Sequence, residues 1–566
     1  MTAVHRVVEQ TFTAGTDHAD PFGTLELDLV VTDPAGTERR VPAFWAGGRT
    51  WRARYSSALP GEHAWRSACS DQDDAGLHDQ LGVFVIEAAE GETNPLYRHG
   101  APTLAEDRRH FRYGDGAPFL WLADTWWMGL VDRLPWPESF EQLAADRRDK
   151  GFNVVQVVAG LYPDMPPFDP RGANEAGFPW DREFTSINPD YFDAADRRIR
   201  ALVDHHLMPV IVGAWGYFMQ VAGEEVMCRH WRNLVARWGA YPVAWCVAGE
   251  ALMAWYDSTV WERIYDAELH GTGEGLAATD VQAHRAKARS GWTRVARHLS
   301  EVDPFQRLVT IHPGSRGRWS YEQVDDLTLL DFDITQCGLH DLLTFPQVID
   351  ELTNELPREP PMPRLIGETC YEGEGGWNWE NVQRLLFWGS MLSGTAGHTY
   401  GATGIWQVNT RDAPFGHDPR PFGESFDEVP WDEAMHYPGS RQVGVGKRLL
   451  ERYRWWRMRP HPEWVRAVGG EKFSPLDAHI RPYAAGIPGE LRIVFLPVRI
   501  LVTVIDLEPG VAYHASYFDP RTGRDHQIGE ARASSDGEWR PPKPPIIQDW
   551  VLVMAASSGM EAKERP

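Results

Sequence analysis

Two apolar stretches of the sequence end in a glutamate and could perform chemistry together. Residues 363–373 read PRLIGETCYEG and residues 242–250 read PVAWCVAGE, so one run leads to Glu368 and the other to Glu250. Buried parallel strands have such runs, and barrel enzymes carry their catalytic groups at the carboxyl ends of these strands. Hydrolysis of a glycosidic bond needs two such carboxylates, one to donate a proton and one on the opposite side of the anomeric carbon.

These glutamates are predicted to be the catalytic pair of a retaining glycosidase, whose carboxylates lie about 5–5.5 Å apart. The alternative is that each is a strand-end residue held by a helix cap or a salt bridge. Small residues before them, Ala248, Gly249 and Gly367, permit close approach and favour the catalytic interpretation. Glu372 is the rival of Glu368 as nucleophile, but it lies past the strand end and is free to turn outward.

Further polar and aromatic side chains lie at or near the ends of the predicted strands, where they could bind sugar hydroxyls or stack on sugar rings. For Asp124 the alternative is a helix cap, for the tryptophans it is a core position, and each of His312, Gln336, His398 and Tyr400 taken alone is better explained as a core polar group with its own partners. Polar groups that converge on one rim need partners, which favours a binding role for the set. Tyr371 could also donate to the nucleophile and keep it ionised. The predicted substrate-binding residues are Asp124, Trp126, Trp127, Trp215, His312, Gln336, Tyr371, His398, Tyr400 and Trp406, with Trp377 a further candidate for stacking.

Apolar strands alternate with amphipathic helices from residue 111 onward, which predicts a parallel α/β architecture. Eight strands in residues 101–458 fit a (β/α)8 TIM barrel with enlarged loops. An open doubly wound sheet is the competitor, but the first strand ends in LADTWW without a glycine-rich phosphate turn. The predicted strands are 119–127, 153–162, 208–215, 242–250, 308–314, 332–338, 364–371 and 397–406, and the predicted helices are 139–150, 190–206, 224–239, 281–299, 346–356, 380–392 and 441–457.

Short runs with period-two alternation flank the barrel on both sides and predict two β-domains. Residues 1–100 are expected to form an N-terminal β-sandwich that either braces the barrel or binds sugar, with strands at 24–31, 51–55, 61–67 and 82–88. Residues 459–556 are expected to form a C-terminal small β-domain, with strands at 491–497, 500–506, 512–518 and 549–555 and a turn at 519–523. Residues 557–566 are predicted to be a disordered tail.

Composition narrows the classes of partner. Lys and Arg number 56 against 80 Asp and Glu, and this net charge of −24 disfavours nucleic acids and anionic membranes as partners. We expect no signal peptide and no membrane-spanning run, and the five scattered cysteines are typical of reduced thiols in a cytoplasmic protein. We expect no metal and no cofactor, a small carbohydrate or glycoside as substrate, and an assembly that is either a monomer or a homo-oligomer.

Several motifs resemble those of apiosidase-like glycoside hydrolases of the glycoside hydrolase family 140 type. They are FLWLADTWW at 119–127, AWCVAGE at 244–250, LIGETCYEG at 365–373 and the late DPRTG and DWVLVM. The resemblance covers most of the chain, including both flanking β-domains. It implies a clan-A-like barrel with the acid/base on the fourth strand and the nucleophile on the seventh, which correspond to Glu250 and Glu368.

The resemblance also implies that Asp124 shapes the sugar subsite. Apiosidase-like relatives often have Asp where this chain has Glu250, and many clan-A enzymes have Asn where Gly249 stands. Glutamate is one methylene longer, so the reach of the acid and the sugar accepted can both differ. The resemblance therefore implies the fold and the reaction, but it does not imply apiose as the substrate.

The leading hypothesis is a metal-independent, exo-acting glycosidase that trims a short oligosaccharide or glycoside. One alternative is a carbohydrate-binding protein without activity. Another is a metal-dependent barrel isomerase or lyase that uses His312, His398 and the carboxylates. Hydrolysis of aryl glycosides that survives EDTA distinguishes the three.

Overall fold

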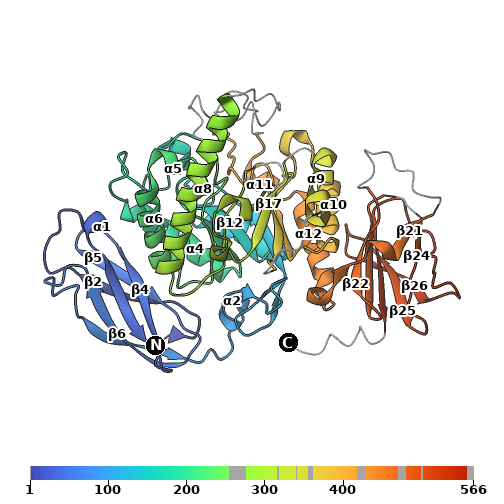
Figure 1. Ribbon diagram of the computed structural model, residues 1–566, viewed down its shortest axis with the longest axis horizontal. Helices are drawn as coiled ribbons and strands as arrows, with labels where there is room; N and C mark the ends of the chain where they lie inside the picture. Colours follow the sequence, from blue (N-terminus) through green and yellow to red (C-terminus); the bar gives the residue numbers. More distant parts are fainter. Residues whose placement is uncertain are drawn as a thin grey trace.

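The computed structural model describes residues 2–253, 276–314, 318–338, 341–354, 361–416, 428–468, 480–498 and 501–556. Figure 1 shows a central α/β barrel with one β-domain on each side, the N-terminal one in blue and the C-terminal one in red. The predicted fold class, a TIM barrel between two β-domains, is confirmed. The predicted tail, 557–566, lies outside the described residues.

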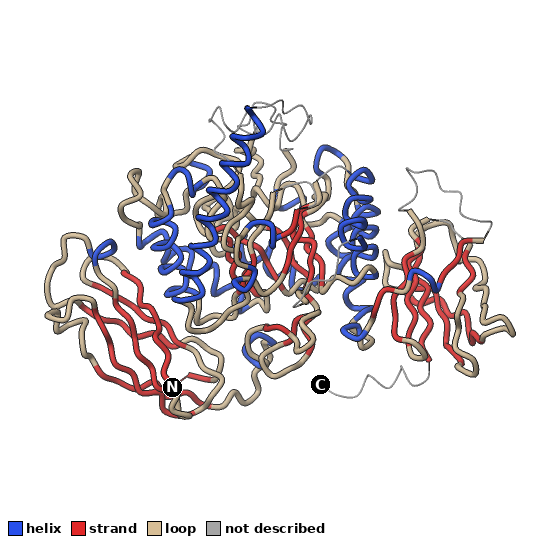
Figure 2. The backbone as a smooth tube through the Cα atoms, in the orientation of Figure 1, coloured by secondary structure: helices blue, strands red, loops and turns tan. Residues whose placement is uncertain are grey.

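Eight parallel strands form the barrel, and helices surround them (Figure 2). In the sheet, β11 pairs with both β12 and β19, which makes the first and the last barrel strand neighbours. Every predicted barrel strand is present in a shorter form, because only the ladder-forming centre of each apolar run is a regular strand. The strands are β11 (Trp121–Thr125), β12 (Val154–Val158), β13 (Met208–Val212), β14 (Ala244–Cys246), β15 (Val309–Thr310), β17 (Asp333–Gln336), β18 (Arg364–Glu368) and β19 (Gly397–Tyr400).

Side chains help to close the barrel between β15 and β17. The hydroxyl of Thr310 donates to the carbonyl of Phe332 at 2.9 Å, and the Asp331 amide donates to the carbonyl of Val309 at 2.8 Å. The Ser320 hydroxyl donates to the carbonyl of Ile311 at 2.6 Å and accepts from the amide of Ile334 at 3.0 Å. These hydroxyls form hydrogen bonds with backbone groups between β15 and β17. In the same region β16 (Arg318–Trp319) pairs antiparallel with the edge of β17 that faces away from β18.

All the predicted helices are present, and their ends differ from the prediction by up to seven residues. The main helices are α3 (Glu138–Lys150), α4 (Pro189–Asp204), α6 (Glu224–Trp238), α8 (Leu276–Val302), α9 (Asp341–Asn354), α10 (Glu380–Leu392) and α12 (Pro438–Leu450), and the short ones are α1 (Pro21–Thr24), α2 (Pro95–Arg98), α5 (Phe218–Val221) and α11 (Trp431–Ala434). The prediction that the last helix runs to residue 457 is wrong. After Leu450 the backbone tightens to three-residue turns, as in the bond from the Tyr453 amide to the carbonyl of Leu450.

The N-terminal domain is a seven-stranded sheet folded into two layers. The strand order is β1-β7-β6-β3-β4-β5-β2, and β4 pairs with β3 through its first half and with β5 through its second half. The layers pack through rings such as Phe12 and Trp65, whose centroids lie 5.7 Å apart. The sequence interpretation missed β1, β2 and β4. The strands are β1 (Thr2–Ala3), β2 (Val8–Thr13), β3 (Leu27–Thr32), β4 (Glu38–Trp45), β5 (Thr50–Tyr55), β6 (Gly61–Cys69) and β7 (Leu81–Glu87).

A small sheet connects this domain to the barrel and closes the base of the barrel. It comprises β8 (Thr103–Leu104), β9 (Phe111–Arg112) and β10 (Pro118–Phe119). Phe111 lies 5.2 Å from Trp121 at the start of β11, and both rings contact Phe332 just before β17, with centroids 5.4 Å apart. An aromatic plug therefore fills the end of the barrel away from the strand carboxyl ends.

The C-terminal domain is a six-stranded sheet, in the order β20-β22-β23-β27-β25-β26, with a two-stranded β21-β24 sheet beside it. One face of the larger sheet packs on the barrel helices, since Phe495 of β23 stacks on Trp388 of α10 at 6.1 Å. The strands are β20 (Arg459–Pro460), β21 (Val465–Ala467), β22 (Tyr483–Ile487), β23 (Leu491–Leu496), β24 (Val502–Val504), β25 (Ala512–Phe518), β26 (Asp525–Arg532) and β27 (Trp550–Ala556).

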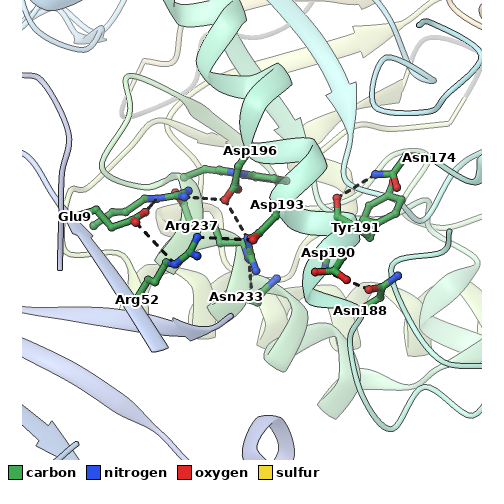
Figure 3. Close-up of polar contacts among 12 residues, drawn as sticks. Glu9, Arg52, Asn174, Asn188, Asp190, Tyr191, Asp193, Asp196, Asn233 and Arg237 are labelled. Carbon is green, nitrogen blue, oxygen red and sulfur yellow. Dashed lines mark hydrogen bonds and ion pairs between the residues drawn. The ribbon is translucent and has the colours of Figure 1, made fainter. Parts of the chain in front are cut away.

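A buried cluster of charges fixes the N-terminal domain to the barrel (Figure 3). Asp196 of α4 accepts from Arg54 of β5 at 2.7 Å and from Arg237 of α6 at 3.0 Å, and Trp238 donates to its other oxygen at 2.7 Å. Burial favours the neutral acid, but the two guanidinium groups outweigh it and hold the pKa of Asp196 below its ordinary value. Arg54 of the N-terminal domain and Arg237 of the barrel thus share one buried carboxylate, which joins the two domains.

We expect Asp196→Ala to destabilise the protein by about 3–5 kcal/mol, because it leaves Arg54 and Arg237 buried without their shared carboxylate. Asp193 of the same helix also pairs with Arg237, at 2.8 Å, but its side chain is 35% exposed. Asp193→Ala should therefore cost less than about 1 kcal/mol. Urea denaturation followed by tryptophan fluorescence measures both changes, and equal losses in the two variants would contradict the assignment.

Candidate active site

Five of the predicted site residues meet at the carboxyl-terminal rim of the barrel. The Trp127 ring lies 5.4 Å from the Trp215 ring and 5.7 Å from the His312 ring. The Trp127 indole donates to the Tyr371 hydroxyl at 2.9 Å. His312 Nε2 lies 3.3 Å from Glu368 Oε2. Residues that are far apart in the sequence therefore form one contiguous cluster, and all five side chains are buried.

A bulge in β18 points Glu368 toward this cluster. Thr335 pairs with Ile366 and the next residue of β17, Gln336, pairs with Glu368, so β18 has one extra residue, Gly367. Ile366 pairs with His398, which faces the outer helices, so simple alternation would send Glu368 outward as well. The extra residue reverses the direction and brings the carboxylate to the interior.

Gly367 and Gln156 hold the bulge in place. Gln156 of β12 reaches across the barrel and donates to the Gly367 carbonyl at 3.0 Å. A Cβ atom at position 367 would lie 3.0 Å from the Cβ of Ile334, so the neighbouring strand leaves no room for a side chain there. Gln156 was not among the predicted site residues. Its signal was a single polar residue within the apolar run VVQVV.

His312 lies beside Glu368, with its Nε2 atom 3.3 Å from Glu368 Oε2. The Nδ1 atom of His312 lies 2.7 Å from the Pro313 carbonyl, which can only accept, so Nδ1 carries a hydrogen. The other nitrogen, Nε2, faces Glu368, and neither Nε2 nor Glu368 Oε2 has a hydrogen-bond partner among the described residues.

Tyr371 completes the surroundings of Glu368. Burial raises the pKa of Tyr371 well above its ordinary value, and its hydroxyl is hydrogen-bonded to Glu368. The hydroxyl keeps its proton and can donate it to the carboxylate, while Trp127 donates to the hydroxyl oxygen. Tyr371 also stacks on Trp406, with centroids 6.1 Å apart, and a Cβ atom at Gly401 would overlap the tyrosine ring. The tyrosine is therefore fixed in one position.

Glu250 lies four residues beyond the last residue of β14, and not at its end as predicted. Its φ is +40°, a left-handed conformation that costs a non-glycine residue on the order of 1–3 kcal/mol. Its Oε2 accepts from the Trp215 indole at 3.3 Å. The Trp215 ring also fills the space that a Cβ atom at position 249 would need, which explains why glycine precedes this glutamate.

Trp215 connects the two predicted catalytic carboxylates. It contacts Glu250 through its indole nitrogen, and its ring lies 6.1 Å from that of His312, which in turn contacts Glu368. The series Glu250–Trp215–His312–Glu368 runs along one rim without a break. Gln336 also belongs to this side, because it pairs with Glu368 and its side-chain oxygen has no hydrogen-bond partner among the described residues.

Four predicted binding residues lie away from this cluster. On β11 and β19, alternate side chains face the outer helices, and Asp124, Trp126, His398 and Tyr400 belong to that face. Asp124 accepts from Arg147 of α3 at 2.5 Å and from the Trp126 indole at 2.7 Å. These four residues therefore lie between the strands and the outer helices, and not at the rim where we expected them to surround the substrate. Arg147, a polar residue within α3, was not predicted.

His398 is the most isolated of the four. Its ring packs against Phe387 of α10 at 5.6 Å, and burial lowers its pKa to about 3. It lies on the opposite face of the sheet from His312. The hypothesis of a metal-dependent enzyme needed both histidines in one site. His312 and His398 lie on opposite faces of the sheet and cannot bind the same metal ion.

Glu372, the rival nucleophile, also lies between the strands and the outer helices. Its oxygens accept from the Tyr400 hydroxyl at 2.6 Å and from the Gly439 amide at the start of α12 at 2.8 Å. Burial raises the pKa of Glu372 to about 7, although both hydrogen bonds oppose the shift. Its carboxyl group therefore holds α12 on the barrel and does not share the cluster of Glu368.

Comparison with known proteins agrees with this fold. The family of apiosidase-like catalytic domains matches residues 105–457, and a domain of unknown function, DUF5060, matches residues 1–70. Curated protein sequences give no match. A solved structure described as a glycoside hydrolase is 19% identical with a TM-score of 0.63, over 81% of this chain and 98% of its own. A glycoside hydrolase family 5 structure from Bacteroides vulgatus ATCC 8482 is 18% identical with a TM-score of 0.64, over 84% and 97%. At these identities the likeness establishes the shared fold.

Three further observations describe the molecule as a whole. None of the helices in the described ranges is long and apolar enough to span a membrane. The same ranges contain no group of three or more histidine, cysteine, aspartate or glutamate side chains that could hold a metal ion. All five cysteines lie in the described ranges and are thiols rather than disulfides.

The raised pKa of Glu372 predicts a pH-dependent stability that a single substitution removes. Below about pH 4.5 the carboxyl is neutral in both the folded and the unfolded chain, and between pH 4.5 and 7 only the unfolded chain ionises. The wild type therefore loses stability over this interval through Glu372. The stability of Glu372→Gln relative to wild type should rise by roughly 3 kcal/mol from pH 4.5 to pH 8, measured by urea denaturation. A difference that stays constant with pH would contradict this.

Proposed function

The chain belongs to the family of apiosidase-like catalytic domains and is a glycoside hydrolase, and we propose that it removes a terminal sugar from a short oligosaccharide or glycoside with retention of configuration. Glu368 is the nucleophile and Glu250 the acid/base in this proposal. The observation that carries it is the continuous rim from Glu250 through Trp215 and His312 to Glu368. Membership of the family 140 type is part of the same proposal.

In the first step, a carboxylate oxygen of Glu368 attacks the anomeric carbon while the bond to the leaving oxygen breaks. Glu250 gives its proton to that oxygen, which leaves as an alcohol. Tyr371 supports this step, since its protonated hydroxyl donates to the Glu368 carboxylate and limits which oxygen attacks. The result is a covalent glycosyl–enzyme and an ionised Glu250.

In the second step, Glu250 takes a proton from water, and the oxygen of that water attacks the anomeric carbon from the side that the leaving group vacated. The bond to Glu368 breaks and its carboxylate is regenerated. Two inversions give net retention. Glu250 is more exposed than Glu368, which is 6% exposed, and this difference suits a group that exchanges protons with water and a nucleophile shielded from it.

Trp127, Trp215 and Trp406 supply flat apolar faces at the same rim, which favours a sugar as the substrate. The reaction as proposed uses no cofactor and no metal. A cytoplasmic location and a small imported substrate remain proposals that follow from the composition. A panel of nitrophenyl pyranosides and furanosides, tested with and without EDTA, identifies the sugar and the independence from metals together.

We expect Glu368→Ala to lose nearly all turnover of an activated aryl glycoside, because no carboxylate remains to attack the anomeric carbon. Added azide should restore turnover and give a glycosyl azide of inverted configuration, since azide fills the space of the lost side chain. Product analysis by NMR measures this. Glu372→Ala is the matched control, and rescue in that variant instead would move the nucleophile to Glu372.

We expect the loss in Glu250→Ala to depend on the leaving group. An alcohol leaving group needs the proton and should lose roughly 10²–10⁴-fold in kcat/KM, which is the usual contribution of general acid catalysis. A dinitrophenyl leaving group departs as a stable anion and should lose far less in the first step. Equal losses across a series of phenols of rising pKa would exclude Glu250 as the acid.

A further inference from the structure

The loop between β18 and α10 presents two tryptophans to solvent. Trp377 is 57% exposed and Trp379 is 42% exposed, whereas the largest tryptophans of the core are fully buried. The loop follows Glu368, the last residue of β18, contains Tyr371 and Glu372, and ends at the start of α10. In a barrel, loops of this kind lie on the face that carries the strand carboxyl ends. The exposed rings therefore belong to the same face as Glu368.

Hydrogen bonds make this loop rigid. The Gly373 amide donates to the carbonyl of Trp377 at 3.1 Å, and the Trp377 amide donates to the carbonyl of Glu374 at 3.1 Å. Gln383 of α10 donates to the carbonyls of Cys370 at 2.8 Å and Asn378 at 3.0 Å. The chain reverses tightly at Gly373, whose φ is +82°, a conformation that suits glycine. The backbone is therefore fixed on both sides of the two tryptophans.

Each ring is supported on one side only. The Trp379 indole donates to the carbonyl of Gly376 at 3.1 Å, and its ring meets the edge of Tyr437 with centroids 5.7 Å apart. Trp377 lies against Gly375, where a Cβ atom would be 2.2 Å from the indole nitrogen. Glycine therefore lets the Trp377 ring rest on the backbone while its other surface stays in water. Two large apolar side chains therefore stay in contact with water, although burying them would stabilise the folded chain. Exposed apolar patches of this kind often mark binding sites.

We propose that Trp377 and Trp379 form a binding platform for the sugar rings of the leaving group, so that the preferred substrate is an oligosaccharide. The proposal rests on the exo-acting hydrolysis proposed above. In such an enzyme the terminal sugar occupies the enclosed site beside Glu368 and the rest of the chain extends outward along the rim. Flat apolar rings that are fixed and exposed are suited to stack on those outer rings. Tyr437, which braces Trp379, comes from the segment before α12, so two rim segments form the platform.

The test compares two substrates that share the terminal sugar identified by the panel. One is an oligosaccharide and the other is the glycosyl fluoride, whose leaving group has no ring. In Trp377→Ala and Trp379→Ala, kcat/KM for the oligosaccharide should fall roughly tenfold, mainly through KM, because the lost contact binds substrate and transition state alike. Turnover of the fluoride should change less than about twofold, which also reports that the variants are folded. Trp→Phe should keep most of the activity, since it keeps a ring.

Leu81→Ala is the matched control, because Leu81 is an exposed apolar residue of the N-terminal domain, 74% exposed and far from the barrel rim. It should leave both substrates unchanged. Equal kinetics of the tryptophan variants and wild type on both substrates would overturn the platform and leave the hydrolytic function intact. A wild type that hydrolyses neither substrate would instead refute the hydrolytic function. A dimer in sedimentation velocity that dissociates in Trp377→Ala would assign this surface to a second copy of the chain and would also overturn the proposal.

Discussion

A carboxylate that is almost completely removed from water is the constraint around which the site is arranged. Burying a charge costs several kcal/mol unless hydrogen-bond donors replace the lost water. For Glu368 the structure supplies the Tyr371 hydroxyl, which Trp127 orients, and it places His312, held by the Pro313 carbonyl, 3.3 Å away. The bulge at Gly367, the glutamine that holds it and the glycine below Tyr371 all follow from placing this one side chain among its donors.

The burial of Glu372 is compensated in a different way from that of Glu368. Its two partners belong to β19 and to the start of α12, so this carboxyl group ties a helix to the barrel. The burial of Asp196 is compensated by two guanidinium groups, and this side chain joins a whole domain. Three buried carboxylates thus have three environments. Of the three, Glu368 lies at the rim, in the series of contacts that leads through His312 and Trp215 to Glu250.

The sequence predicted the fold well because parallel barrel strands are apolar on both faces and read as continuous runs. The same property hid the direction of each side chain. Asp124 and Tyr400 belong to the face toward the helices, as His398 does, and no local signal in an all-apolar strand distinguishes that face from the interior. Alternation counted along β18 would even have sent Glu368 outward, because a bulge is a property of the pairing with β17. Glu250 and Glu368 could be proposed from sequence because the small residues before each of them are visible there, whereas Gln156 and Arg147 act through contacts across the fold.

The most direct test of the central claim is to trap the covalent intermediate. A 2-deoxy-2-fluoro glycoside of the preferred sugar, with a good leaving group, should inactivate the enzyme with one label per chain. Digestion and tandem mass spectrometry should locate the label on Glu368. A label on Glu372 or another residue, or a product of inverted configuration with no label at all, would contradict the account.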